Sequence, residues 1–92
     1  MFTVARVMRQ PQELRPGEEE MCWDHIGEGT YIDSAATLEA ALPMFESSGV
    51  RFIPVVSLQA DAPPDLLGAL FYVDALKAYN RALAATAAEE HS

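Results

Sequence analysis

The chain is organised around the run Gly49-Val50-Arg51-Phe52-Ile53-Pro54-Val55-Val56, which a loop joins to the run Leu66-Leu67-Gly68-Ala69-Leu70-Phe71. Both runs are apolar and short, and the first is rich in β-branched residues, so each predicts a β-strand. An apolar run without alternation is typical of a strand that is buried on both faces. Pro54 has no N–H group to donate to a neighbouring strand, so we expect one side of the first strand to be open there. An open strand edge beside the start of a helix is a place where a small ligand can bind.

A helix is predicted on the N-terminal side of the first strand, over residues 38–48. Its apolar stripe has helical spacing and consists of Leu38, Ala41, Leu42 and Phe45. Thr37 suits the N-cap, because its hydroxyl can accept a hydrogen bond from a free backbone N–H group of the first turn. Gly49 suits the left-handed residue that ends a helix. Pro43 lies past the first turn, where it removes a backbone hydrogen bond, so we expect a kink or an irregular first turn.

A second helix is predicted after the second strand, from about residue 73 to the mid-80s. Its apolar stripe consists of Val73, Leu76, Tyr79 or Asn80, and Leu83. Residues 57–65 separate the two strands and contain Pro63 and Pro64, and we expect them to form a surface loop longer than a tight hairpin turn. Gly68 lies inside the second strand, where a glycine often marks the close approach of another backbone or of a ligand.

The composition fits one small folded domain, because the 92 residues are half apolar. The formal net charge is −8, and the six Lys and Arg residues are scattered along the sequence. Such a chain is unsuited to nucleic acid or to an anionic membrane surface, since both are bound by clustered basic residues. There is no apolar run long enough to span a bilayer and no secretory signal, and the single cysteine, Cys22, favours a reducing compartment. We therefore expect a cytoplasmic location.

The N-terminal third of the chain contains few signals of regular structure. Residues 1–8 form a leader with a short, mixed apolar segment, and residues 9–29 contain two prolines, three glycines and many acidic residues. The second segment predicts an acidic insertion loop whose few apolar side chains dock on the domain. The alternative is a specific contact with a partner protein, for which Trp23 would be the anchor.

The order and spacing of several short motifs resemble the CBS domain, a nucleotide-sensing module named after cystathionine β-synthase. These motifs are Thr37-Leu38-Glu39-Ala40-Ala41, Gly49, Ile53-Pro54-Val55-Val56, Gly68 and Asp74-Ala75-Leu76. The resemblance implies an α+β fold, a small βαββα unit in which two helices pack on a three-stranded mixed sheet. In this interpretation the first strand lies at Thr30-Tyr31-Ile32-Asp33, the unit spans residues 30–86, and residues 87–92 form a polar tail. A single unit implies pairing as a homodimer or with a second CBS unit of a longer parent chain.

The resemblance further implies a regulatory ligand, which would be AMP, ADP, ATP or S-adenosylmethionine, without any required cofactor. The implied nucleotide-binding residues are Ile32, Val50, Arg51, Phe52, Ile53, Pro54 and Asp74. Asp74 would accept hydrogen bonds from the ribose hydroxyls. The family usually has Thr or Ser three residues earlier, where this chain has Phe71, a side chain that cannot donate a hydrogen bond. The alternative for Asp74 is a structural role at the start of the final helix, where a carboxylate stabilises the helix dipole.

The sequence contains no catalytic arrangement, so we expect no enzyme activity. It has no phosphate-binding glycine-rich loop, no paired His ligands and no Ser-His-Asp grouping. Cys22, Asp24 and His25 are close in sequence, but a structural zinc site needs about four ligands, usually in spaced pairs. We therefore expect no metal site.

Three hypotheses of function follow from the resemblance. The first is a cytoplasmic regulatory module of a CLC-type chloride channel or transporter, because residues 74–83 resemble the closing helix of bacterial members. Such a module would sense an adenine nucleotide or mediate dimer contacts, and would act on the membrane transport domain of the same protein. The second is a free-standing soluble nucleotide sensor. The third is a structural dimerisation module without a ligand, which Phe71 favours.

Overall fold

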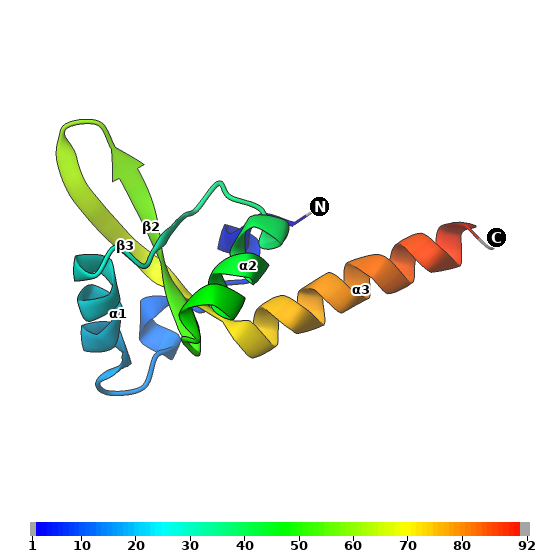
Figure 1. Cartoon of the computed structure of the whole chain (residues 1–92), viewed down its shortest axis with the longest axis horizontal. Coiled ribbons are helices and arrows are strands. Elements are labelled where there is room, and N and C mark those ends of the chain that lie inside the picture. Colours follow the sequence, from blue (N-terminus) through cyan, green and yellow to red (C-terminus); the bar gives the residue numbers. More distant parts are fainter. Residues whose placement is uncertain (1, 91–92) are drawn as a thin grey trace.

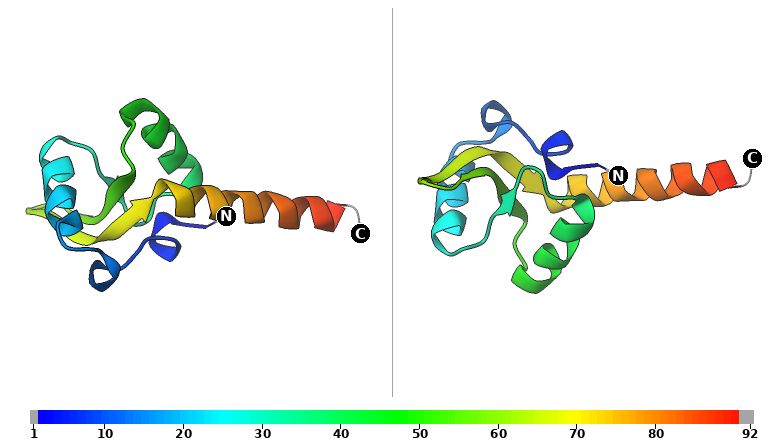
Figure 2. Two further views of the ribbon diagram at one scale, coloured as in Figure 1. Left: turned by 90° about the horizontal axis from the view of Figure 1, so that it is seen from below. Right: turned by 90° about the horizontal axis from the view of Figure 1, so that it is seen from above.

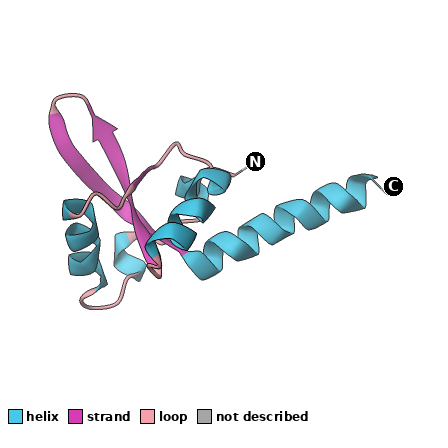
Figure 3. Cartoon of the chain, in the orientation of Figure 1, coloured by secondary structure: helices cyan, strands magenta, loops and turns pink. Residues whose placement is uncertain are grey.

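The structure, a computed structural model, describes residues 2–90 and the side chains as far as residue 84. In chain order it contains the 3-10 helices η1 (Val4–Arg6) and η2 (Pro11–Glu13), helix α1 (Glu18–Gly27), strand β1 (Ile32–Asp33), helix α2 (Leu38–Ser48), strands β2 (Phe52–Gln59) and β3 (Ala62–Phe71), and helix α3 (Tyr72–Glu90). Figures 1 and 3 show that the other helices gather around the end of the β2–β3 hairpin opposite its turn, while α3 extends away from it. The fold is α+β, as predicted, with one helix more than expected. Within the described residues, no helix has the length and apolarity needed to cross a membrane.

The sheet has the mixed three-stranded arrangement that the sequence predicts, in the order β1-β2-β3. β1 runs parallel to β2, with Ile32 opposite Val55, and β3 runs antiparallel to β2, with Phe71 opposite Phe52. Pro54 lies in the central strand opposite Ala69 of β3, whereas β1 pairs with β2 only at the next two positions. The β1 side of the strand is therefore unpaired at Pro54, as expected for a residue without an N–H group.

The predicted surface loop over residues 57–65 is wrong. β2 continues to Gln59, β3 begins at Ala62, and only residues 60–61 form the turn. Pro63 and Pro64 lie in β3, where the pairing register shifts between Ser57 and Gln59. Proline is tolerated at such an irregularity because its missing N–H group interrupts no regular ladder of hydrogen bonds.

One face of the sheet is covered by α2, the leader and the start of α3. Its buried residues form the first core cluster, which consists of Val4, Ile32, Leu38, Ala41, Phe45, Ile53, Val55, Leu70 and Ala75. The Thr37 side chain caps α2 as predicted, since its Oγ1 accepts a hydrogen bond from the Ala40 N–H at 3.3 Å. Gly49 ends the helix with a φ of 71°, also as predicted. α2 is assigned as one unbroken helix through Pro43, so the lost backbone bond does not divide it.

The opposite face is covered by α1, which forms inside the segment predicted to be an acidic loop. The second core cluster consists of Cys22, Phe52, Ala69 and Phe71, with Leu14 and Leu66 packed against it. Glu18, Glu19 and Glu20 occupy the first turn of α1, where carboxylates stabilise the helix dipole. Of the ten residues of α1, only Glu18 and Cys22 are buried. A helix that buries so little has no apolar stripe, which explains why the sequence did not indicate it.

The leader packs on the domain, and its Val4 side chain is completely buried in the first core cluster. Thr3 forms an isolated β-bridge to Thr37, and Arg9, just after the leader, forms one to Ala69 on the free edge of β3. A Cβ atom at Gly68 would overlap the backbone carbonyl oxygen of Arg9. The glycine inside β3 therefore marks the close approach of another backbone, one of the two alternatives that the sequence indicated.

Helix α3 packs on the domain only with its first turns (Figures 1 and 2). Ala75 is buried, and Tyr72 and Ala78 are partly buried against the first core cluster. The predicted apolar stripe instead faces solvent, because Val73, Leu76 and Leu83 are 50%, 38% and 52% exposed. α3 continues to Glu90, so the predicted polar tail is helical over residues 87–90, and its last two residues lie outside the described part.

Candidate functional site

The six basic residues, scattered in the sequence, gather around the start of α3. Two surface grooves lie there. The leader groove, of about 690 Å³, is lined by Phe2, Arg6, Val7, Asp74, Lys77, Ala78, Arg81 and Ala82. The arginine groove, of about 490 Å³, is lined by Arg9, Arg15, Glu18, Arg51, Phe71, Tyr72, Val73 and Leu76. Each groove contains three of the six Lys and Arg residues of a chain whose net charge is −8. The basic residues are therefore scattered along the sequence but line two grooves in the structure.

An ion pair between Arg9 and Asp74 separates the two grooves. The Arg9 Nε donates to Asp74 Oδ2 at 2.8 Å, and Arg9 Nη2 donates to Oδ1 at 3.4 Å. The two residues are 65 positions apart in the sequence and meet because Arg9 pairs its backbone with Ala69 at the edge of β3. The hydrogen bond to Asp74 raises the pKa of the Arg9 guanidinium above its ordinary value, so Arg9 stays charged.

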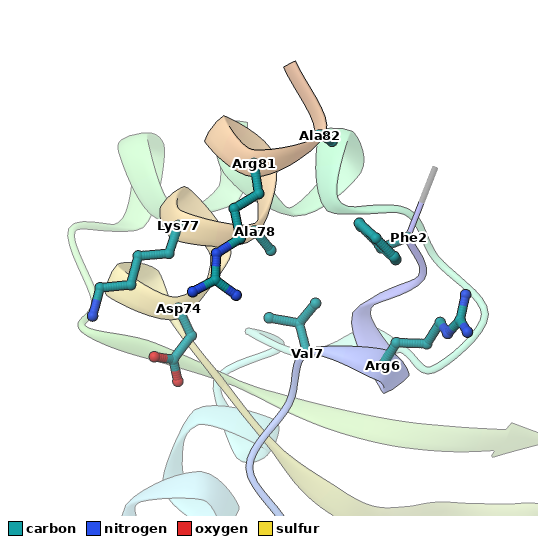
Figure 4. Close-up of a pocket in the computed structure, with 8 residues that line it drawn as sticks. All are labelled: Phe2, Arg6, Val7, Asp74, Lys77, Ala78, Arg81 and Ala82. Atoms are coloured by element: carbon teal, nitrogen blue, oxygen red, sulfur yellow. The ribbon is translucent and has the colours of Figure 1, made fainter. Parts of the chain in front are cut away.

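The leader groove lies between the leader and α3. Figure 4 shows Phe2, Arg6 and Val7 on one side and the α3 residues on the other, with the Arg81 guanidinium directed into the groove and the Lys77 side chain directed away. Among the described residues, none of the ion pairs involves Arg6, Lys77 or Arg81. These three charges are therefore available to an anionic ligand. The Arg6 guanidinium also lies over the Phe2 ring, 5.7 Å from its centroid.

The arginine groove is built around Glu18, the one buried charged residue in the described part of the chain. One carboxylate oxygen of Glu18 accepts the backbone N–H of Arg15, at 2.6 Å, and the other accepts Arg51 Nη2 at 3.1 Å. The Arg51 side chain is 71% exposed, so solvent screens this ion pair. Glu18 thus ties the start of α1 to the loop that leads into β2.

The structure distributes the seven predicted nucleotide-binding residues between the core and the grooves. Ile32, Phe52, Ile53 and Pro54 are buried, and Val50 is half-buried. Only Arg51 and Asp74 line one of the two grooves, Arg51 in the arginine groove and Asp74 in the leader groove. In this structure a ligand in the grooves therefore meets only Arg51 and Asp74 of the predicted set.

Asp74 forms an ion pair with Arg9, which neither of the two roles predicted for it included. It was predicted to hold a ribose or to act as an acid at the start of a helix, and it lies in the first turn of α3 while it binds Arg9. Its side chain is 25% exposed. A carboxylate has about four lone-pair sites, and Arg9 uses two of them, so the remaining sites can accept ligand hydroxyls.

Sequence reasoning missed five basic residues of the grooves: Arg6, Arg9, Arg15, Lys77 and Arg81. For Lys77 and Arg81 a signal was present, because residues 74, 77 and 81 have the i, i+3, i+7 spacing of one helix face. For the others no local signal existed, since their place depends on how the first 17 residues fold onto the domain. Phe71, noted as unable to donate a hydrogen bond, instead supports the Arg9 guanidinium, which lies 4.1 Å from the ring centroid.

The residues around Cys22 do not assemble into a metal site. Cys22 is buried, whereas Asp24 is exposed and His25 lies 3.8 Å from a carboxylate oxygen of Glu28. Among the side chains that the structure describes, no three His, Cys, Asp or Glu residues are placed to hold a metal ion together. Burial and the nearby carboxylates of Glu18 and Glu19 raise the pKa of the Cys22 thiol to about 11. The thiol is therefore protonated and unreactive at neutral pH.

Comparisons with protein-family models, with curated proteins and with solved structures found no match to this chain. The resemblance to the CBS domain therefore rests on the motifs of the sequence alone.

Proposed function

We propose that the chain is a regulatory module that binds an anionic ligand of the nucleotide class in the leader groove. The observation that carries the proposal is the concentration of every Lys and Arg residue of an acidic chain in two adjoining grooves. In a chain of net charge −8, clustered cations without carboxylate partners produce a local field that attracts anions.

The shape and lining of the leader groove support a ligand with both a phosphate and an apolar part. Its volume of about 690 Å³ lies in the range of small-molecule sites, which is roughly 300–1,000 Å³. Arg81, whose guanidinium is directed into the groove (Figure 4), would neutralise phosphate oxygens, and Arg6 and Lys77 add positive charge at its edges. Val7, Ala78 and Ala82 form an apolar wall. The Phe2 ring at the rim is a surface on which a base could stack.

Asp74 gives the groove one acceptor beside its cations, which suits the vicinal hydroxyls of a ribose. AMP, ADP and ATP carry both the phosphates and the ribose that this arrangement fits. S-adenosylmethionine carries a sulfonium cation and no phosphate, so the charge of the groove disfavours it. We therefore narrow the ligands implied by the CBS resemblance to the phosphorylated ones, and expect affinity to rise from AMP to ATP.

The test is a thermal titration of the chain with AMP, ADP, ATP and S-adenosylmethionine. A ligand at a hundredfold excess over its Kd stabilises the folded state by about 2.7 kcal/mol, which raises the melting temperature of a domain this small by several degrees. Arg81→Gln should reduce the shift that ATP produces, while Arg15→Gln, the same change of charge in the arginine groove, should leave it in place. No shift with any nucleotide, or equal loss in both variants, would remove the leader groove as the site.

The CBS resemblance implies two kinds of protein to which the module could belong. In the first form of the proposal it is a cytoplasmic regulatory part of a CLC-type chloride channel or transporter, and in the second it is a free-standing nucleotide sensor. The support for the first is the similarity of residues 74–83 to the closing helix of that family. A gene in which apolar spans of about 20 residues are encoded with this module would favour the first form.

A second candidate function is dimerisation through α3, and the exposed stripe of that helix favours it. Val73, Leu76 and Leu83 have helical spacing and are exposed, and the later turns of α3 extend from the domain (Figure 2). A helix of this kind is only marginally stable in water without a packing partner. Light scattering should give the mass of a dimer, and Leu83→Glu should convert it to a monomer. A monomer of the unmodified chain at high concentration would exclude this function.

A further inference from the structure

We infer that the arginine groove is a separate binding site for a phosphate monoester, whose phosphate would bind to the guanidinium groups of Arg9 and Arg51. The inference does not depend on what the leader groove binds. It rests on two guanidinium groups that share one aromatic ring, on the carboxylates that hold them there, and on the apolar side of the same groove.

The two guanidiniums approach the same ring. The Cζ atom of Arg9 lies 4.1 Å from the centroid of Phe71, and the Cζ atom of Arg51 lies 6.0 Å from it. Arg51 also lies 5.8 Å from the centroid of Phe52, which stacks on Phe71 at 5.0 Å. The Phe71 ring therefore contacts the Arg9 guanidinium directly, and the Arg51 guanidinium lies near both rings of the stacked pair.

Each of the two guanidinium groups is paired with a carboxylate. Asp74 accepts from Nε and Nη2 of Arg9, and Glu18 accepts from Nη2 of Arg51. No hydrogen bond in the described part uses Nη1 of either arginine. Arg9 and Arg51 thus have separate carboxylate partners, and their two positive charges face the same groove. An anion between them would turn the repulsion of these like charges into two charge-assisted interactions, and the arginines would need little reordering to make them.

The charged side chains that line the arginine groove are mainly cationic. Arg9, Arg15 and Arg51 contribute three positive charges and Glu18 one negative charge, while Asp74 and Glu13 act on Arg9 from outside this lining. Arg15 is exposed and forms no ion pair among the described residues. The Arg15 side chain is therefore free to change its conformation when a ligand binds. Its planar guanidinium is well suited to a further contact with the phosphate.

The remainder of the groove indicates an ester and not a free phosphate. Val73 and Leu76 line it and are 50% and 38% exposed, and the Tyr72 side chain lies beside them. These side chains would be partly covered by an apolar or aromatic alcohol group attached to the phosphate. The volume of about 490 Å³ accommodates a small ester of this kind.

The experiment is a titration of the full chain with phenyl phosphate, inorganic phosphate and benzenesulfonate at constant ionic strength, followed by the arginine Nε–Hε signals in NMR spectra. Phenyl phosphate should bind most tightly and should shift the Arg9 and Arg51 signals. Arg51→Gln should weaken its binding about tenfold or more. Arg6→Gln, a matched change of charge in the leader groove, should leave the Kd of phenyl phosphate within about twofold.

Arg15→Gln provides a second variant, because it preserves the backbone N–H that Glu18 accepts. It should weaken phenyl phosphate binding severalfold without a change in the melting temperature. Equal weakening by Arg6→Gln, or the absence of saturable binding to the unmodified chain, would overturn the site. Inorganic phosphate binding as tightly as phenyl phosphate would overturn the role of Val73 and Leu76. A nucleotide shift that survives Arg51→Gln would show that the two grooves act separately.

Discussion

The two faces of the sheet are built in different ways. On one face α2 buries Leu38, Ala41 and Phe45 in a large apolar cluster, and both ends of the helix carry sequence signals. On the other face α1 contributes only Cys22 to a small cluster that the strands themselves largely form. Figure 1 shows α1 and α2 to the left and right of the lower part of the hairpin. The apolar spacing of a sequence therefore indicates a helix clearly only when that helix buries several apolar side chains.

The difference extends to the grooves. The face that the sequence predicts well supplies stability, whereas the arginine groove forms where the N-terminal segment and the start of α1 meet β3 and α3. The predictions that follow test whether the two faces differ in energy as they differ in burial.

The largest expected effect is that of Phe45→Ala on the α2 face. Phe45 is 2% exposed and stacks on Tyr72 with 4.8 Å between ring centroids. Its truncation should lower the free energy of unfolding by about 3–5 kcal/mol, as measured by urea denaturation. Trp23→Ala on α1 is the control, since Trp23 is 48% exposed and its loss should change stability by less than about 0.5 kcal/mol. A comparable loss in both variants would contradict the comparison of the two faces.

On the α1 face the expected effect depends on pH through Cys22. The folded state raises the pKa of its thiol from 9.0 to about 11, so the unfolded chain loses this proton first as the pH rises. The contribution of the thiol to the free energy of unfolding is therefore complete below pH 9 and is lost between pH 9 and 11. The expected loss is roughly 2–3 kcal/mol, because one pKa unit corresponds to about 1.4 kcal/mol. Denaturation at several pH values, compared with Cys22→Ala, isolates the effect because the other titrating groups are common to both. An unchanged difference between the two proteins from pH 9 to 11 would show that the thiol is not shielded.

Gly68→Ala tests the contact that fastens the N-terminal segment to the sheet edge. The new methyl group would overlap the Arg9 carbonyl, so the segment must move, and we expect a loss of about 1–3 kcal/mol. Hydrogen exchange of the Ala69 and Arg9 amides should become faster, since each donates to the other residue. Gly27→Ala is the control, because its methyl group would meet no atom within 4 Å, and it should be neutral or slightly stabilising. Protected amides in Gly68→Ala would contradict the close approach.

The smallest effect is expected at the cap of α2. Thr37→Ala removes the acceptor of the Ala40 N–H and should cost about 1 kcal/mol in thermal or urea unfolding. Thr37→Ser keeps the hydroxyl and should retain most of the stability. If both variants lose the same amount, the Thr37 methyl group and not the cap accounts for the effect.

Much of the central unit could be predicted from the sequence. The strands around Ile53 and Leu70, the cap at Thr37, the end at Gly49 and the meaning of Gly68 all depend on residues within a few positions of one another. Local geometry decides such features, so local patterns indicate them. The predicted loop over residues 57–65 failed because proline was interpreted as a break, while the irregular pairing there tolerates it.

Only part of the predicted site lines the grooves in the structure. Arg51 and Asp74 line the grooves, whereas Phe52 and Ile53, which the same pattern included, are core residues. Arg9 was missed because its position depends on a backbone bridge to Ala69, 60 residues further along the chain. No local pattern carries information about such a contact.

The sequence by itself determined the strand pair at the centre, the limits of α2 and the acidic character of the whole chain, because these follow from short-range sterics, apolar spacing and composition. The α+β fold class was implied by the resemblance of its motifs to the CBS domain. Only the tertiary structure decided that residues 18–27 form a helix on the second face, that the stripe of α3 faces solvent, and that the six cations line two grooves. The physical reason is that these features depend on which distant surfaces pack together, and burial and charge proximity exist only once they have done so.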